Sequence, residues 1–130
     1  MRLIFALIAL AIALPAAAAP TPQSLMVGTW RSTDDARSMV EVRADGSWID
    51  RYIGEPSATT TSHWLLFSGA KPPKAAASES LDAKSTYLEV SDKDGALFYA
   101  LEHVDAKSLE LLYPDRGKTL TYRRVKAVAH

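Results

Sequence analysis

The chain contains no cysteine among its 130 residues. It can therefore form no disulfide, and it offers no thiolate as a nucleophile or as a metal ligand. It also lacks the cysteine to which a lipid anchor would be attached at a processed N-terminus. The fold must depend on the packing of one hydrophobic core, which is feasible for a domain of ~100–150 residues.

The sequence also lacks an excess of charge of either sign. Its 15 lysine and arginine residues match its 15 aspartate and glutamate residues, so the formal net charge is zero. The densest basic stretch, Arg123 to Lys126, ends an alternating run and contains no interleaved aromatic residues for stacking on bases. This composition gives no basis for nucleic-acid binding.

Long apolar runs are missing except at the start of the chain. Twelve apolar residues extend from Leu3 to Leu14, preceded by Arg2 and followed by small residues through Ala19. A helix of this length spans about 18 Å, too little for a hydrocarbon core of roughly 30 Å. The pattern predicts a signal peptide over residues 1–19, one domain over residues 20–130, and a periplasmic or secreted protein with no stable membrane span.

Helical periodicity is nearly absent after the leader, whereas short alternating runs recur between turn signals such as Asp45-Gly46 and Asp94-Gly95. Alternation with a period of two is typical of half-buried strands, so the fold class is predicted to be all-β. Short connections favour pairing between strands that are neighbours in the sequence. Eight strands in this order can close into an antiparallel up-and-down barrel that leaves no strand edge exposed. One interruption begins at Gly69, and its low-complexity stretch from Lys71 to Ser80 is expected to be a mobile loop or a single short helical turn. The expected strands are residues 25–32, 38–43, 47–53, 59–67, 85–91, 96–104, 108–113 and 118–125.

The two ends of this pattern carry a family resemblance. Gly28-Thr29-Trp30 opens the first run, and Arg124 shares a face with Leu120 and Tyr122 on the last run. The arrangement resembles the bacterial lipocalin-like domains of the calycin group. In that family an arginine on the last strand packs over the tryptophan and closes one end of the barrel. The resemblance therefore implies a barrel-closing contact between Trp30 and Arg124, with Arg123 pointing the other way.

Catalytic and metal-binding patterns are not found. His63, His103 and His130 are not at ligand spacing, and no serine lies in a Gly-x-Ser-x-Gly elbow. Asp50 is the one acidic residue that alternation can place inside, between Trp48 and Tyr52, although a register shift of one residue would place it in solvent. No catalytic residue, metal or cofactor is predicted, and an enzymatic role is not favoured.

Two functions remain open from the sequence. By analogy with the family, a small, partly apolar ligand would bind at the barrel mouth, with Trp48, Tyr52, Trp64 and Tyr99 as walls. Alternatively, the same aromatic residues fill the barrel, since eight strands enclose a space that side chains can occupy. The chain would then be a protein-binding module, such as an inhibitor or an envelope accessory factor, and would contact a periplasmic protein through the loop from Gly69 to Ala83.

Overall fold

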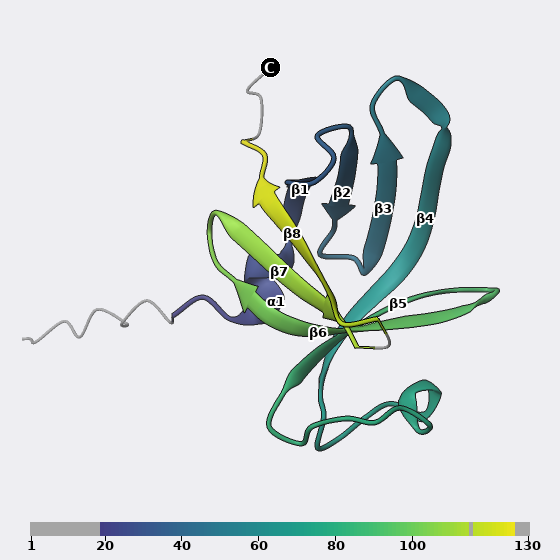
Figure 1. Ribbon diagram of the computed structural model, residues 1–130, viewed down its shortest axis with the longest axis vertical. Coiled ribbons are helices and arrows are strands. Elements are labelled where there is room, and N and C mark those ends of the chain that lie inside the picture. Colours follow the sequence, from purple (N-terminus) through teal and green to yellow (C-terminus); the bar gives the residue numbers. More distant parts are fainter. Residues whose placement is uncertain (1–18, 115, 127–130) are drawn as a thin grey trace, which may run out of the picture.

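The computed structural model describes residues 19–114 and 116–126 of the chain (Figure 1). The predicted signal peptide lies outside these residues except for its last position. None of the helices in the described part is both long and apolar enough to cross a membrane.

Eight antiparallel strands follow one another around a closed barrel, with each strand hydrogen-bonded to its neighbours in the sequence. This architecture confirms the predicted all-β fold and its up-and-down order. The helical elements are short, as expected from the lack of helical periodicity. In chain order the elements are α1 (Pro22–Met26), β1 (Gly28–Ser32), β2 (Ser38–Val42), β3 (Ser47–Tyr52), β4 (Glu55–Ser68), η1 (Lys74–Ala76), β5 (Thr86–Asp92), β6 (Gly95–Val104), β7 (Ser108–Tyr113) and β8 (Lys118–Arg124).

The barrel closes between its first and last strands. Trp30 of β1 pairs with Arg124 of β8, and Ser32 pairs with Tyr122. Paired residues lie on the same face of a sheet, so these pairs set which side of β8 faces the interior. The interior cluster of fully or nearly fully buried residues consists of Met26, Trp30, Val40, Val42, Trp48, Trp64, Leu88, Val90, Leu109 and Leu111.

The chain before β1 differs from the prediction. Leu25 was expected to begin the first strand, but it lies in the helix α1, and β1 begins at Gly28. The Thr21 hydroxyl accepts a hydrogen bond from the backbone N–H of Ser24 at 3.2 Å, and Pro22 occupies the first turn. An N-cap threonine followed by proline is a local helix start that needs no long periodic pattern.

Strand β4 also begins earlier than predicted, at Glu55 instead of Thr59. Its pairing with β5 starts only at His63, so the first half of β4 is paired with β3 alone. Pro56 has no backbone N–H to donate, and it is tolerated because that half of the strand has a free edge. Beyond this point the β3–β4 and β5–β6 hairpins extend in different directions (Figure 1).

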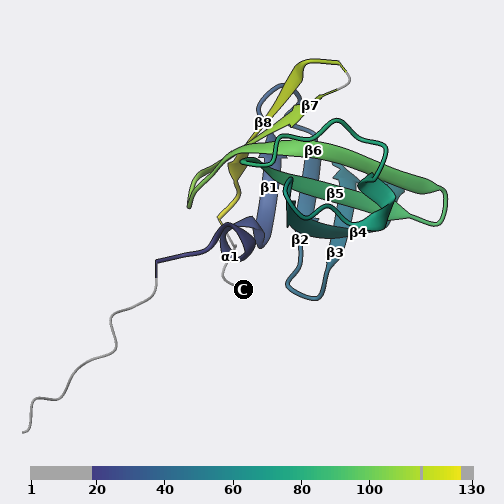
Figure 2. The same cartoon turned by 90° about the horizontal axis from the view of Figure 1, so that it is seen from below.

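A second hydrophobic cluster lies outside the barrel. Phe67, Tyr87 and Phe98 meet on the outer face of β4, β5 and β6, with ring centroids 5.6 Å apart for Phe67 and Tyr87 and 6.1 Å apart for Phe67 and Phe98. The segment between β4 and β5 passes over them and buries Ala76 of η1 (Figure 2). Of the two expectations for this segment, the short helical turn is found.

Candidate ligand-binding site

One end of the barrel interior is filled by side chains. Met26, Trp30, Leu88 and Leu109 are at most 1% exposed, and we call this region the closed end. Helix α1 lies across it, and the Trp30 indole Nε1–H donates to the Met26 carbonyl at 2.9 Å. The polar atom of the largest buried side chain is therefore satisfied by the segment that covers it.

Arg124 ties α1 to the barrel. Its guanidinium carbon lies 4.2 Å from the ring centroid of Trp30, and it donates to the carbonyls of Val27 and Ala106, both at 2.7 Å. It also donates to the Leu25 carbonyl in the last turn of α1. Arg123, the neighbouring arginine, is exposed. The indole contact contributes ~0.5–2 kcal/mol, and the charge-assisted hydrogen bonds add to it.

Gly28 makes room for the Arg124 guanidinium at the closed end. A Cβ atom at this position would collide with Nη1 of Arg124, and the backbone φ of +144° is one that side chains rarely adopt. The glycine of the Gly-x-Trp motif is thus required for the guanidinium to reach the Val27 carbonyl.

Two residues predicted as ligand walls lie elsewhere. Trp64 is 5% exposed, and its indole Nε1–H donates to the Arg43 carbonyl at 2.8 Å, so it belongs to the packed interior beside the β2–β3 turn. Tyr52 lies beneath the guanidinium of Arg37, whose carbon is 4.6 Å from the ring centroid. Neither residue lines the cavity described next. Of the four predicted wall residues, the structure therefore brings only Trp48 and Tyr99 together at this cavity.

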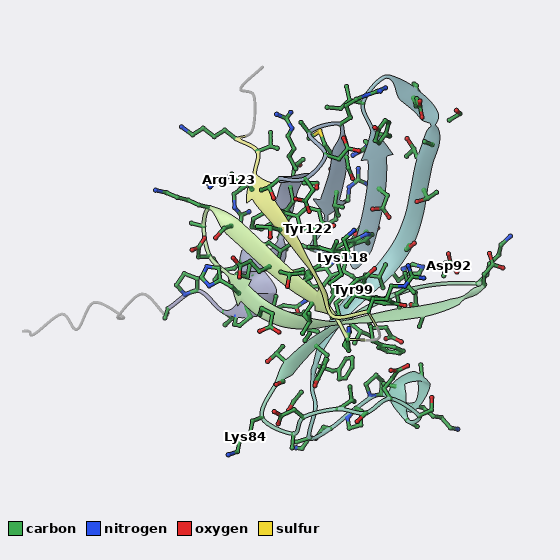
Figure 3. The ribbon with its side chains drawn as sticks, in the orientation of Figure 1. Lys84, Asp92, Tyr99, Lys118, Tyr122 and Arg123 are labelled. Carbon is green, nitrogen blue, oxygen red and sulfur yellow. The ribbon has the colours of Figure 1, made fainter. Side chains whose placement is uncertain are left out.

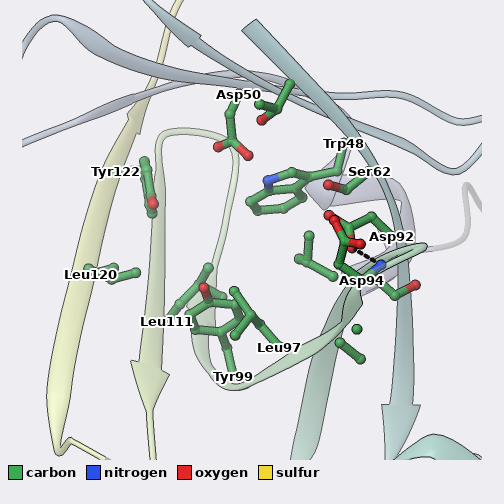
Figure 4. A pocket seen from close by; sticks show the side chains of 15 residues that line it. Trp48, Asp50, Ser62, Asp92, Asp94, Leu97, Tyr99, Leu111, Leu120 and Tyr122 are labelled. Atoms are coloured by element: carbon green, nitrogen blue, oxygen red, sulfur yellow. Dashed lines mark hydrogen bonds between the residues drawn. The ribbon is translucent and has the colours of Figure 1, made fainter. Parts of the chain in front are cut away.

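The other end of the interior contains a cavity of about 470 Å³, and we call it the open end (Figure 4). Trp48 and Tyr99 line it, as do the exposed rim residues Asp92, Asp94 and Leu97. Trp48 is only 5% exposed and belongs both to the packed interior cluster and to the cavity lining. The remaining lining residues are Asp50, Thr60, Ser62, Val90, Ser91, Gly95, Ala96, Leu111, Leu120 and Tyr122.

The splayed hairpins explain why this end is hollow. Thr60 and Ser62 come from the half of β4 that β5 does not pair with, whereas Asp92, Asp94 and Leu97 come from the tip of the β5–β6 hairpin. Figure 3 shows Asp92 far out on that hairpin, with Tyr99 and Tyr122 nearer the barrel axis. Leu97 is 49% exposed although its neighbours Val90 and Tyr99 face the interior, so solvent reaches the cavity here.

Three polar side chains face the inner part of the cavity from different strands. Asp50, Tyr99 and Tyr122 project from β3, β6 and β8 into the space that Trp48 borders (Figure 4). Burial raises the pKa of the Asp50 carboxyl, while hydrogen bonding by the side chains of Trp48 and Thr60 acts in the opposite direction. Of the two placements considered for Asp50, the inward one is found.

The two tyrosines keep their protons at neutral pH. Burial, with a smaller effect of the Tyr99 and Asp50 charges, raises the pKa of Tyr122 to about 12. Burial also raises the pKa of Tyr99, with Asp50 as the second cause. Both hydroxyls are therefore neutral groups that can donate or accept a hydrogen bond from a ligand.

Asp50, Tyr122 and the rim aspartates were missing from the predicted walls. The alternation had already placed Tyr122 on the inner face, and the β5–β6 turn was recognised as a hairpin. Whether these residues line one cavity depends on how far each strand extends along the barrel, and alternation does not determine this.

The histidines and carboxylates elsewhere form no comparable site in the described part of the chain. His63 is exposed, and His103 lies 2.8 Å from the carboxylate of Asp105 on the surface. The backbone hydrogen bond from Lys107, followed by the contact with His103, lowers the pKa of Asp105. Across residues 19–114 and 116–126, no three histidine, aspartate or glutamate side chains are grouped as a metal site would require.

No family model, curated protein or solved structure matches the chain.

Proposed function

We propose that this chain is an exported lipocalin-like protein that binds a small, partly apolar molecule in the cavity at the open end of its barrel. The cavity itself carries the proposal. Its volume of about 470 Å³ lies within the range of roughly 300–1,000 Å³ typical of small-molecule sites. Its lining combines apolar and aromatic walls with hydroxyl and carboxylate groups that can orient a ligand.

The division of the barrel supports the same proposal. The closed end is packed and tied down by Trp30 and Arg124, so the hollow end is not needed to hold the barrel together. Water would occupy the cavity in the absence of a ligand, and an apolar ligand would displace it favourably. The export half of the proposal depends on the sequence of residues 1–19.

The alternative, a protein-binding module, is less well supported. The segment proposed to contact a partner covers the outer cluster of Phe67, Tyr87 and Phe98 and buries Ala76. The Tyr87 hydroxyl also accepts a hydrogen bond from the backbone N–H of Asp82 at 2.8 Å. These contacts account for the segment as part of the fold.

A fluorescence titration with the neutral dye Nile red tests the proposal. Ser62 lines the cavity from β4, whereas the adjacent Thr61 is exposed and is not among the lining residues. Nile red should bind the wild-type protein and Thr61→Trp alike, and Ser62→Trp should weaken binding at least about tenfold by filling the space. Equal binding by both variants, or no binding by the wild type, would refute the proposal.

Export is tested separately by intact-mass measurement of protein recovered from the periplasm of a bacterial host. Loss of about 17–19 residues is expected for a leader of this type. Recovery of the full-length chain only in the membrane or the cytoplasm would contradict export without bearing on the cavity.

A further inference from the structure

The charges that line the cavity are all of one sign. Asp50, Asp92 and Asp94 are among its lining residues, whereas none of the described residues that line it is a lysine, arginine or histidine. The whole chain has equal numbers of acidic and basic residues, so this lining does not reflect its overall composition. The cavity should therefore favour positively charged ligands and repel anions.

The neighbouring cations form no salt bridge with this lining within the described part of the chain. Lys93 lies between Asp92 and Asp94 in the exposed turn of the β5–β6 hairpin. Arg116 and Lys118 border a smaller groove that adjoins the cavity along Leu97, Tyr99 and Leu120. The Arg116 guanidinium carbon lies 6.0 Å from the Tyr113 ring centroid. Within the described part of the chain, the salt bridges involve Glu41 and Asp105 and none of the three cavity aspartates. Asp50 thus faces the cavity without a cationic partner among these residues.

Asp50 is an unfavourable residue for the barrel interior. It lies on the inward face of β3, immediately before a bulge that separates it from Tyr52. A carboxylate withdrawn from water loses hydration free energy, and that loss is recovered only when a cation or several donors are placed against it. Hydrogen bonding by the side chains of Trp48 and Thr60 offsets this loss only in part, because the pKa of Asp50 is still raised. A positive charge inside the cavity would therefore stabilise the Asp50 carboxylate further.

The surrounding rings suit the same kind of ligand. Trp48, Tyr99 and Tyr122 border the cavity around Asp50 (Figure 4). Aromatic faces attract ammonium groups by ~0.5–2 kcal/mol, and tryptophan is the most effective of them. Leu97, Leu111 and Leu120 complete the lining with apolar surface that can hold the rest of an organic molecule.

We infer that the ligand of this cavity is an organic cation, an amine or quaternary ammonium on an apolar or aromatic body. Its positive charge would lie between Asp50 and the rings of Trp48, Tyr99 and Tyr122. The inference rests on the proposed function and specifies its ligand class. An inorganic cation is a poorer fit, because a divalent metal needs at least three converging ligands and the described residues provide no such group.

Calorimetric titration with three probes that share a phenylethyl body and differ in their polar group tests the inference. The probes are 2-phenylethylamine, the neutral 2-phenylethanol and the anionic 3-phenylpropionate. The amine should bind the wild-type protein at least about tenfold more tightly than the alcohol, and the carboxylate should bind most weakly. Asp50→Asn should bring amine binding down to the level of the alcohol, whereas Glu102→Gln, at an exposed position outside the cavity, should leave the order unchanged.

The possible failures are distinguishable. If Nile red binds but the alcohol or the carboxylate binds as tightly as the amine, the cationic ligand class is wrong and the ligand-binding cavity remains. If the amine preference survives in Asp50→Asn and disappears in the Asp92→Asn/Asp94→Asn double variant, the rim and not Asp50 selects the charge, which overturns the assignment. If neither Nile red nor any of the three probes binds, the proposed function fails together with the inference. A thermal melt of each variant checks that it is folded.

Discussion

Each end of the barrel has a tryptophan and a charged residue on its inner face, but their surroundings differ. At the closed end, Trp30 is fully buried and hydrogen-bonded, and Arg124 pairs its charge with carbonyl groups and a ring. At the open end, Trp48 borders a cavity of about 470 Å³, and the Asp50 charge faces that space without a cationic partner among the described residues. The contrast indicates that stability is concentrated at one end, which leaves the other free to be hollow.

Substitution of a tryptophan at each end should give the largest contrast. Trp30→Ala should lower the free energy of unfolding by about 3–5 kcal/mol, because it removes a fully packed side chain and leaves the Met26 carbonyl without its donor. Trp48→Ala should cost about 1–2 kcal/mol less, because part of that ring faces the cavity and has fewer atoms to lose contact with. Urea unfolding measures both values. Equal costs would show that the open end is as tightly packed as the closed end.

Substitution of the two adjacent arginines on β8 should give the next largest difference in stability. Arg124→Ala should cost about 2–3 kcal/mol, since it strips charge-assisted hydrogen bonds from the carbonyls of Val27 and Ala106 and uncovers Trp30. Arg123→Ala, at the adjacent exposed position, should change stability by no more than about 0.5 kcal/mol. Thermal melts of the two variants provide the comparison. Similar destabilisation by both would mean that Arg124 does not close the barrel.

Alanine substitutions at two glycines with nearly the same φ should show a smaller difference in stability between the ends. Gly28 has φ of +144° with Arg124 against it, whereas Gly95 has φ of +149° and a Cβ atom there would meet no described atom within 4 Å. Alanine at either position should cost ~1–3 kcal/mol of backbone strain. Gly28→Ala should cost about 1 kcal/mol more, because it displaces the Arg124 guanidinium from its hydrogen bonds. Chemical denaturation measures this difference, and a larger cost at Gly95 would contradict it.

The smallest effect expected is a gain of stability at the open end. The raised pKa of Asp50 means that the folded state holds this proton more tightly than the unfolded chain does. Stability contributed by the protonated form is therefore lost as the pH rises through the folded pKa. Asp50→Asn should melt at a higher temperature than the wild type at pH 7, and the difference should shrink as the pH falls toward the ordinary value of 3.8. A lower melting temperature at pH 7 would show that Asp50 is already paired.

The sequence was sufficient to predict the strands and their order, because alternation and hairpin glycines are local signals. Gly46, for example, has φ of +95° in the turn that joins β2 and β3. Alternation also placed Trp48 and Trp64 on the inner face, but it left open whether Asp50 faces the interior or the solvent. It could not tell at which level of the barrel they lie, and so Trp64 and Trp48 were assigned to one wall although only Trp48 borders the cavity.

The other differences have equally specific causes. Helix α1 has only five residues, too few for a periodic pattern, and its signal was the Thr21-Pro22 cap. The outer cluster of Phe67, Tyr87 and Phe98 lies on the face that alternation assigns to solvent, and only the following loop makes it a buried surface. Contacts of this kind depend on the path of a loop over the sheet, which local sequence does not specify.

The three tryptophans provide the most direct test of the division between a filled and a hollow end. The indole N–H groups of Trp30 and Trp64 donate to the carbonyls of Met26 and Arg43, whereas Trp48 lines the cavity. In a ¹H–¹⁵N spectrum assigned with single Trp→Phe variants, titration with 2-phenylethylamine should shift the indole signal of Trp48 and leave the other two in place. Shifts of the Trp30 or Trp64 signals with no change at Trp48 would contradict a binding cavity at the open end.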